Sequence, residues 1–256
     1  MRKEFEKKLG LHGSDDYGAW IKGTRTLRQL IGYLGMLLPV FLITFSNKCD
    51  ELPLESISHY FYTRSNSFFI VILSLVGIFL IIYTKDFILS SIAGICALCV
   101  VFFPTDPLLD RCCIVDIPGN NCREGFHYLS AAIFLVILAY MCIRKFTKLD
   151  KEEIDMRHDK VKYKLFYKIC GYMMLLSLAI IGLKFLSSKF FPDSFEGFIE
   201  FYDENQLTFW MELVALEFFG LAWLVKGYNT IKYSDYRIHL FRGASSELKY
   251  KSSKNN

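Results

Sequence analysis

The sequence lacks the short motifs that mark familiar catalytic centres. It contains no GxSxG nucleophile turn, no HExxH zinc-binding helix, no phosphate-binding loop and no dinucleotide-binding fingerprint. It also shows no internal repeat, no flexible linker and, apart from the polar tail at 245–256, no low-complexity tract. These absences exclude the enzyme classes that such motifs identify, and they leave a single domain as the simplest description.

Charge is missing from long stretches of the chain, which is 53% hydrophobic and 16% aromatic. Four windows of roughly 19 or 20 residues carry no charge, about the length that a helix needs to cross a bilayer. A fifth apolar window contains Lys168 and Lys184, and a sixth contains Glu212 and Glu217. We therefore predict an all-α membrane protein with six transmembrane helices. The predicted spans are about 29–47, 66–84, 87–105, 126–143, 166–188 and 207–226, which together form a membrane domain at 27–226.

The charge distribution predicts the orientation. Six spans put the N-terminal segment 1–26 and the C-terminal tail 227–256 on one side. That side holds 24 of the 30 lysines and arginines, whereas five lie on the other side and Lys184 lies inside the fifth span. Because basic loops stay in the cytoplasm, we predict cytoplasmic termini. The charged N-terminal segment does not resemble a secretory signal, and we expect a multi-pass protein of the bacterial inner (plasma) membrane. The basic face carries no nucleic-acid-binding motif, so the expected partners are membrane lipids.

Four cysteines fall in predicted outer loops: Cys49, Cys112, Cys113 and Cys122. In an oxidising compartment they can form one or two disulfides. Zinc binding by the last three is the alternative, although their spacing matches no familiar site.

Polar residues converge at the predicted outer side of the membrane. The run SISHYFYTRSN at 56–66 leads into the second span, and the aromatic residues of this segment are typical of an interface belt. Other polar residues fall at the end of span three, at the start of span four and in span six. The candidate ligand-binding residues are His59, Arg64, Asp106, His127, Glu212 and Glu217. Three of them also have a structural interpretation: Asp106 suits a turn, His127 a helix cap, and Arg64 a contact with lipid phosphates.

The two carboxylates in the sixth span require compensation, because burying one in a bilayer costs on the order of 2.5 to 3.5 kcal/mol. We expect Glu212 to meet Arg64 or His127, with Lys184 of the fifth span as the alternative partner. Glu217 lies deeper, where we expect it to be protonated or hydrogen-bonded to a serine or threonine of another span.

These residues favour a protein that binds or organises lipids without catalysis and without a cofactor. The first alternative is a metal-dependent hydrolase of a lipid ester or amide, with zinc held by His59, Asp106 and His127 and with Glu212 as acid or base. The second alternative is a small transporter in which Glu217 relays protons.

Several runs also carry a resemblance to a known group of proteins: SISHYFYT, FFPTDP, GFHYLSAA and FWMELVALEFFGLAWLVKG. They resemble small bacterial six-helix integral membrane proteins of unknown function, which are distantly similar to the damage-regulated autophagy modulator type of membrane protein. The resemblance implies a six-span fold and a role in membrane lipid organisation or remodelling. The chain departs from the pattern at Asn66-Ser67, where such relatives carry an arginine and an acidic residue; here Arg64 lies two residues earlier.

Overall fold

The computed structural model describes residues 14–46, 53–107, 119–148 and 160–228, and every regular element in these ranges is a helix. The all-α class predicted from the sequence is therefore confirmed. The elements are α2 (Ser14–Phe45), the 3-10 helix η1 (Ile57–Tyr62), α3 (Asn66–Ile82), α4 (Phe87–Phe102), α5 (Asn121–Tyr140), the π-helical turn η2 (Met141–Lys145), α6 (Lys160–Phe190), α7 (Glu196–Glu204) and a final helix, Leu207–Tyr228.

Four of these helices are long and apolar enough to cross a membrane: Gly23–Phe45, Asn121–Lys145, Tyr163–Phe190 and Leu207–Tyr228. Helices α3 and α4 are apolar but have only 17 and 16 residues. At 1.5 Å per residue they are about 24 to 26 Å long, less than the roughly 30 Å of a typical hydrocarbon core. The chain is thus a multi-pass membrane protein by composition and helix length.

Side-chain caps and prolines explain several helix boundaries. The Asn120 side chain accepts hydrogen bonds from the backbone N–H groups of Cys122 and Arg123, at 2.9 and 3.3 Å, and so starts α5 several residues before its uncharged window. Helix α4 ends at Phe102, just ahead of Pro104. The nine-residue helix α7 was not predicted, because it is too short and too acidic to register as a span.

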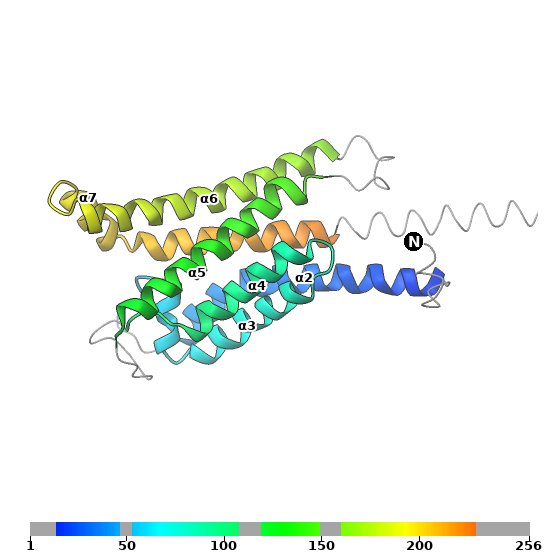
Figure 1. Cartoon of the computed structure of the whole chain (residues 1–256), viewed down its shortest axis with the longest axis horizontal. Helices are drawn as coiled ribbons and strands as arrows, with labels where there is room; N and C mark the ends of the chain where they lie inside the picture. The colour runs from blue at the N-terminus through cyan, green and yellow to red at the C-terminus, as the bar shows by residue number, and fades with distance from the viewer. Residues whose placement is uncertain (1–13, 47–52, 108–118, 149–159, 229–256) are drawn as a thin grey trace, which may run out of the picture.

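Glycines allow two helix pairs to approach closely. A Cβ atom added to Gly220 of the final helix would lie 2.7 Å from the carbonyl oxygen of Gly32 in α2. A Cβ atom on Gly77 of α3 would lie 3.0 Å from the carbonyl oxygen of Gly94 in α4. Such backbone contact is a common basis of helix association in membranes. The final helix is therefore the direct neighbour of α2, and α3 and α4 form a tight hairpin (Figure 1).

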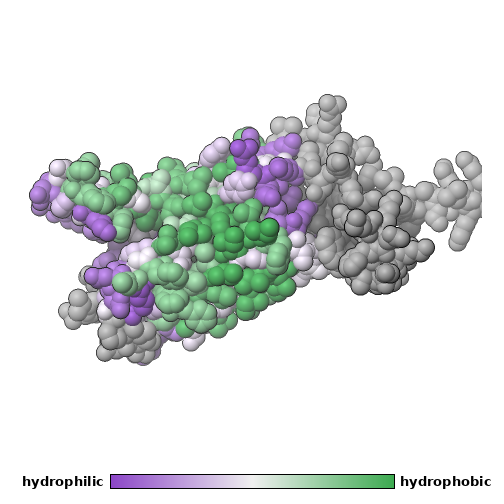
Figure 2. Space-filling view, viewed as in Figure 1, coloured by the Kyte–Doolittle hydropathy of each residue, from purple (hydrophilic) through white to green (hydrophobic). Residues whose placement is uncertain are grey.

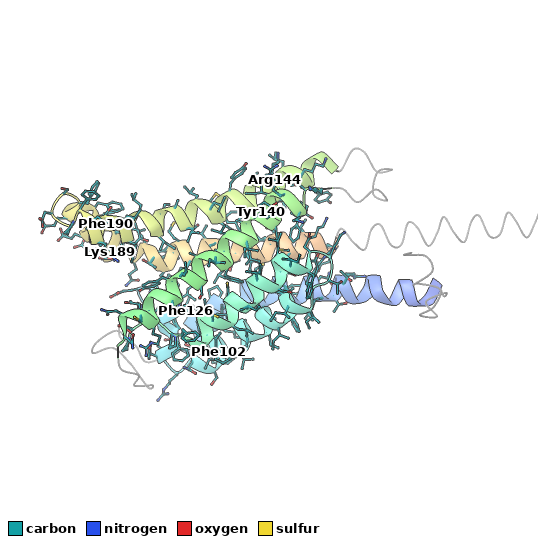
Figure 3. The ribbon with its side chains drawn as sticks, viewed as in Figure 1. Phe102, Phe126, Tyr140, Arg144, Lys189 and Phe190 are labelled. Carbon is teal, nitrogen blue, oxygen red and sulfur yellow. The ribbon has the colours of Figure 1, made fainter. Side chains whose placement is uncertain are left out.

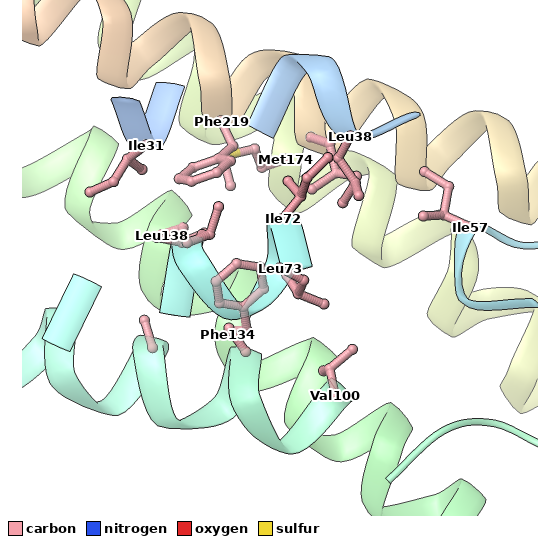
Figure 4. Packing of buried hydrophobic residues seen from close by; sticks show 14 of the residues in the cluster. Ile31, Leu38, Ile57, Ile72, Leu73, Val100, Phe134, Leu138, Met174 and Phe219 are labelled. Carbon is pink, nitrogen blue, oxygen red and sulfur yellow. The ribbon is translucent and has the colours of Figure 1, made fainter. Parts of the chain in front are cut away.

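One apolar core joins all the long helices. Figure 4 shows side chains from every long helix and from η1 meeting in it. The labelled members are Ile31, Leu38, Ile57, Ile72, Leu73, Val100, Phe134, Leu138, Met174 and Phe219. Outside this core, Figure 2 shows an apolar band around the middle of the bundle with polar residues towards its ends, the pattern expected of a surface that faces lipid.

Helix α6 is the least enclosed of the four membrane-length helices. Only 22% of its apolar window is buried, against 39% in each of the other three. In its second half Leu183, Phe185 and Leu186 are all about half exposed. Helix α7 folds back against this half, where Asp203 pairs with Lys184 at 3.0 Å.

Candidate functional site

One end of the bundle gathers five of the six candidate residues, namely Arg64 in the turn after η1 and the four described next. We call it the η1 end. It consists of η1, the segment after α4, the start of α5, the start of the final helix and α7 (Figure 1). His59 comes from η1, Asp106 follows α4, His127 lies in the first turns of α5, and Glu212 lies near the start of the final helix. The predicted convergence of these four residues is therefore present in the fold.

Glu212 holds the beginning of η1. The Ser56 hydroxyl donates to both carboxylate oxygens, at 3.0 and 2.8 Å, and the Ile57 N–H donates to one of them at 2.6 Å. The same Ser56 Oγ caps η1 by accepting from the Ser58 N–H at 3.1 Å. Charge-assisted hydrogen bonds of this kind compensate a carboxylate for its lost water.

The partners expected for Glu212 were wrong, since neither Arg64 nor His127 is its hydrogen-bond partner. The physical reason is that the first backbone N–H group of η1, that of Ile57, and its capping residue Ser56 lie against the final helix. This N–H group and the capping hydroxyl satisfy the carboxylate before any cation does.

His127 ties three elements together. Its side chain is 2% exposed; Nδ1 lies 2.8 Å from the Phe103 carbonyl oxygen, and Nε2 lies 2.9 Å from Ser58 Oγ. A carbonyl oxygen can only accept, so Nδ1 carries the proton, and in the neutral ring Nε2 accepts from the Ser58 hydroxyl. His127 thus connects α5 to the end of α4 and to η1 and is more than the helix cap that its position suggested.

His59 is half buried, and its Nδ1 atom has no hydrogen-bond partner in the described part of the chain. Burial disfavours the charged ring and the nearby His127 adds to the effect, so the pKa of His59 falls from its ordinary 6.5 to about 4. The ring is consequently neutral at pH 7 and has a spare buried nitrogen.

Asp106 fixes the segment after α4 to the start of α5. Its Oδ1 atom lies 2.9 Å from Arg123 Nη2 and accepts from the Asn120 N–H at 2.9 Å. Arg123 Nε also donates to the Pro104 carbonyl at 3.0 Å. Arg123 is a residue that the sequence analysis missed, because nothing in a charge count distinguishes a paired arginine from one that faces lipid.

The alternative metal site does not assemble from its expected ligands. Within the described ranges, which include His59, Asp106 and His127, no three His, Cys, Asp or Glu side chains lie close enough to hold a metal ion. Both ring nitrogens of His127 already have partners, and Asp106 is paired with Arg123. Of the outer cysteines, Cys122 is exposed and forms no disulfide, and Cys49, Cys112 and Cys113 lie outside the described residues.

Arg64 is exposed and makes no hydrogen bond or ion pair with any residue that the structure describes. The turn that carries it is held on both sides. Thr63 Oγ1 lies 2.8 Å from Ser65 Oγ, and the Asn66 side chain donates to the Phe61 carbonyl. A fixed turn therefore presents a free guanidinium group at the η1 end.

The aromatic residues of η1 are not an interface belt, contrary to the expectation. Tyr60, Phe61 and Tyr62 are at most 8% exposed, because η1 folds back into the bundle, where Tyr62 donates a hydrogen bond to the Thr105 carbonyl. Other rings surround the site at its surface. Phe102, Phe103 and Phe126 are 72%, 41% and 43% exposed, and Figure 3 shows the first and last of them on α4 and α5.

Glu217 lies one and a half turns further along the final helix and is half exposed. It makes no hydrogen bond or ion pair within the described ranges, so the expected serine or threonine partner is not found there. Glu217 is thus separate from the network at the η1 end.

The opposite end of the bundle buries two cations that the charge count assigned to an exposed face. Arg28 is 3% exposed, and its Nε and Nη2 atoms donate to Tyr83 Oη at 3.0 and 2.8 Å. Lys226 is 7% exposed; its Nζ lies 3.4 Å from the Phe146 carbonyl oxygen and 5.8 Å from the centre of the Tyr167 ring. Both positions contribute to packing as well as to charge.

Comparison of the chain with protein-family models, curated proteins and solved structures found no match. The resemblance to six-helix bacterial membrane proteins therefore stays a prediction, and the function has to be argued from the geometry of the η1 end.

Proposed function

We propose that the protein is a six-span protein of the bacterial inner membrane, with both termini in the cytoplasm, which binds lipid headgroups at the η1 end in the outer leaflet. The proposal has three parts, namely the number of spans, the orientation and the ligand. Each part has its own support.

Support for six spans comes from the turn between the short helices α3 and α4. Asp86 in this turn pairs with Lys145, at the far end of α5, at 2.9 Å. Tyr83, directly after α3, accepts from Arg28. Both contacts lie at the opposite end of the bundle from η1, so α3 and α4 each run the length of the apolar band although they are short. A bilayer can thin locally to match such helices at modest cost.

Support for the orientation comes from charge. The loops and termini at the end opposite η1 carry most of the lysines and arginines, which favours the cytoplasm for that end. The η1 end then meets the outer headgroups.

The observation that carries the ligand assignment is the free Arg64 guanidinium on its fixed turn. It lies at the same end of the bundle as the exposed rings of Phe102 and Phe126, which suit the boundary between acyl chains and headgroups. A guanidinium binds phosphate through two parallel hydrogen bonds, and no side chain in the described ranges is hydrogen-bonded or ion-paired to this one. Figure 2 shows a hollow at this end, between α7 and the start of α5, that a headgroup can enter from the side.

Titration of the detergent-purified protein with short-chain phosphatidylglycerol tests the proposal. Hydrogen bonds to a charged group contribute about 1.5 to 3 kcal/mol, so Arg64→Ala should weaken binding by about tenfold or more. Arg144→Ala is the matched control, because it removes the same charge from an exposed site at the other end (Figure 3). Equal affinities for the two variants would refute the headgroup site.

One observation favours the transporter alternative, namely a half-exposed Glu217 that lies inside an apolar helix and pairs with none of the residues that the structure describes. Proton-coupled uptake into vesicles should then disappear in Glu217→Gln. Uptake that persists in this variant would remove the reason for the hypothesis.

A further inference from the structure

Ser58, His127 and the Phe103 carbonyl form a hydrogen-bonded chain in the order hydroxyl, imidazole, acceptor. Ser58 Oγ lies 2.9 Å from Nε2, and Nδ1 lies 2.8 Å from the carbonyl oxygen. The carbonyl holds the proton on Nδ1 and so leaves Nε2 unprotonated towards the serine. A nucleophile, a base and a third group that orients the base are the parts required for nucleophilic catalysis.

We propose that Ser58 and His127 form a metal-independent nucleophilic centre that accepts the acyl group of a lipid ester or amide. The inference deepens the headgroup proposal and rests on it, since a lipid bound at the η1 end would bring its acyl linkage to this depth. It assigns a role to Ser58, which the sequence analysis did not single out.

The reaction proceeds through an acyl-enzyme. Ser58 Oγ bonds to the carbonyl carbon of the substrate, and the hydroxyl proton passes to His127 Nε2. The bond from the carbonyl carbon to the leaving oxygen or nitrogen then breaks, and Nε2 returns the proton to the leaving group. Water attacks the acyl-serine next: His127 takes one of its protons and delivers it to Ser58 Oγ, which releases the fatty acid.

Two neighbours suit the same chemistry. His59 follows Ser58 in the chain and has a buried, unpartnered Nδ1 among the described residues. With its proton on that nitrogen, the neutral ring can donate to the oxygen that becomes negative. Glu212 is a positioning residue, because through Ser56 and Ile57 it fixes the start of the helix that carries Ser58.

The surroundings suit an acyl chain. Phe103, whose carbonyl orients His127, presents an exposed ring that lies edge-on to the Phe126 ring, with the ring centres 4.8 Å apart. Ser58 itself is half buried, while His127 is almost completely shielded. The base is therefore protected from water, and the nucleophile lies beside an apolar surface that an acyl chain can contact.

The Ser58–His127 hydrogen bond could serve only to hold η1 against α5, or it could activate Ser58 as a nucleophile. In the first case Ser58 is as unreactive as any other serine, so a measurement of its chemical reactivity distinguishes the structural role from the catalytic one. An alkyl fluorophosphonate reacts with an activated serine, forms an oxygen–phosphorus bond and releases fluoride. We expect one adduct per chain, located at Ser58 by peptide mapping. Ser58→Ala and His127→Gln should reduce labelling at least tenfold. Ser67→Ala, which removes an exposed serine at the start of α3, should label like the wild type.

Peptide mapping of the wild-type adduct keeps the test valid if either variant fails to fold. A folded wild-type protein that takes up no probe, or an adduct that persists in Ser58→Ala, would overturn the assignment. The two proposals also fail separately. Phosphatidylglycerol binding without any adduct refutes only the serine centre, whereas an adduct at Ser58 without lipid binding refutes only the headgroup site.

Discussion

Glu212 and Glu217 lie in the same helix but differ in their hydrogen bonds, so a comparison of their alanine variants tests whether Glu212 anchors η1. The comparison does not require the exact free-energy cost of placing a carboxylate in the membrane. Both residues lie in the final helix, so replacing either by alanine has the same effect on helix propensity and removes one charge from an apolar helix. The relief from removing that charge, about 2.5 to 3.5 kcal/mol at the centre of a bilayer, is at least as large for Glu217, which lies deeper, as for Glu212. What differs is the set of hydrogen bonds that each variant loses.

Glu212→Ala leaves the Ser56 hydroxyl and the Ile57 N–H without their acceptor, whereas Glu217→Ala breaks no hydrogen bond among the described residues. Two donors to a charged group contribute about 3 to 6 kcal/mol together. For a chain of this size, 1 kcal/mol shifts the unfolding midpoint by roughly 2 to 4 °C. We therefore expect Glu212→Ala to unfold at least about 6 °C below Glu217→Ala.

The assay is thermal unfolding of both variants in one detergent, followed by tryptophan fluorescence and by loss of a monodisperse elution peak. Glu217→Ala is the control, and we expect it to be as stable as the wild type or more stable. Equal midpoints, or a lower midpoint for Glu217→Ala, would refute the reasoning that Glu212 anchors η1.

Two further predictions concern packing and pH. Gly220→Ala should destabilise the bundle by about 1 to 3 kcal/mol in thermal unfolding, because the new methyl group would lie 2.7 Å from the Gly32 carbonyl oxygen, whereas Gly182→Ala, with no atom within 4 Å, should not. The pKa of His59 falls from 6.5 in the unfolded chain to about 4 in the folded protein, because burial disfavours the charged ring. The contribution of the neutral ring to the free energy of unfolding is therefore complete above pH 6.5 and is lost as the pH falls towards about 4. Unfolding midpoints measured between pH 7 and pH 4 should therefore decline less steeply in His59→Gln than in the wild type, and parallel declines would contradict this reading.

The positions of the long helices could be predicted because a lipid environment imposes one strong rule, an uncharged stretch of sufficient length. The same rule does not locate helix ends, which depend on local caps such as Asn120. It also cannot find α7, whose nine residues include four acidic side chains. The aromatic residues of η1 were misassigned because Tyr60 and Phe61 suit an interface belt and a buried turn equally well by composition.

The sequence identified several ionisable residues that the fold brings to the η1 end, but it missed Ser58 and Arg123 and the hydrogen bonds that connect the network. Glu212 and His127 stood out because ionisable groups in apolar segments are unusual. Their partners could not be found, since Ser58 and His127 are 69 positions apart and serine is common in every class of segment. Only the folded chain shows that two hydroxyls of the SISHY run, Ser56 and Ser58, face a carboxylate and an imidazole.

The final helix is synthesised after every other helix that the structure describes, yet it packs directly on α2, the first of them. Until Leu207–Tyr228 is inserted, the backbone face around Gly32 has no partner and η1 lacks the carboxylate that holds its first residues. The earlier helices can already pack on one another, as α3 and α4 do, but these two contacts have to wait for the final helix. The contact with α2 and the completion of the η1 end then form in a single event, when the final helix is inserted, and a chain shortened before residue 207 would lose both at once.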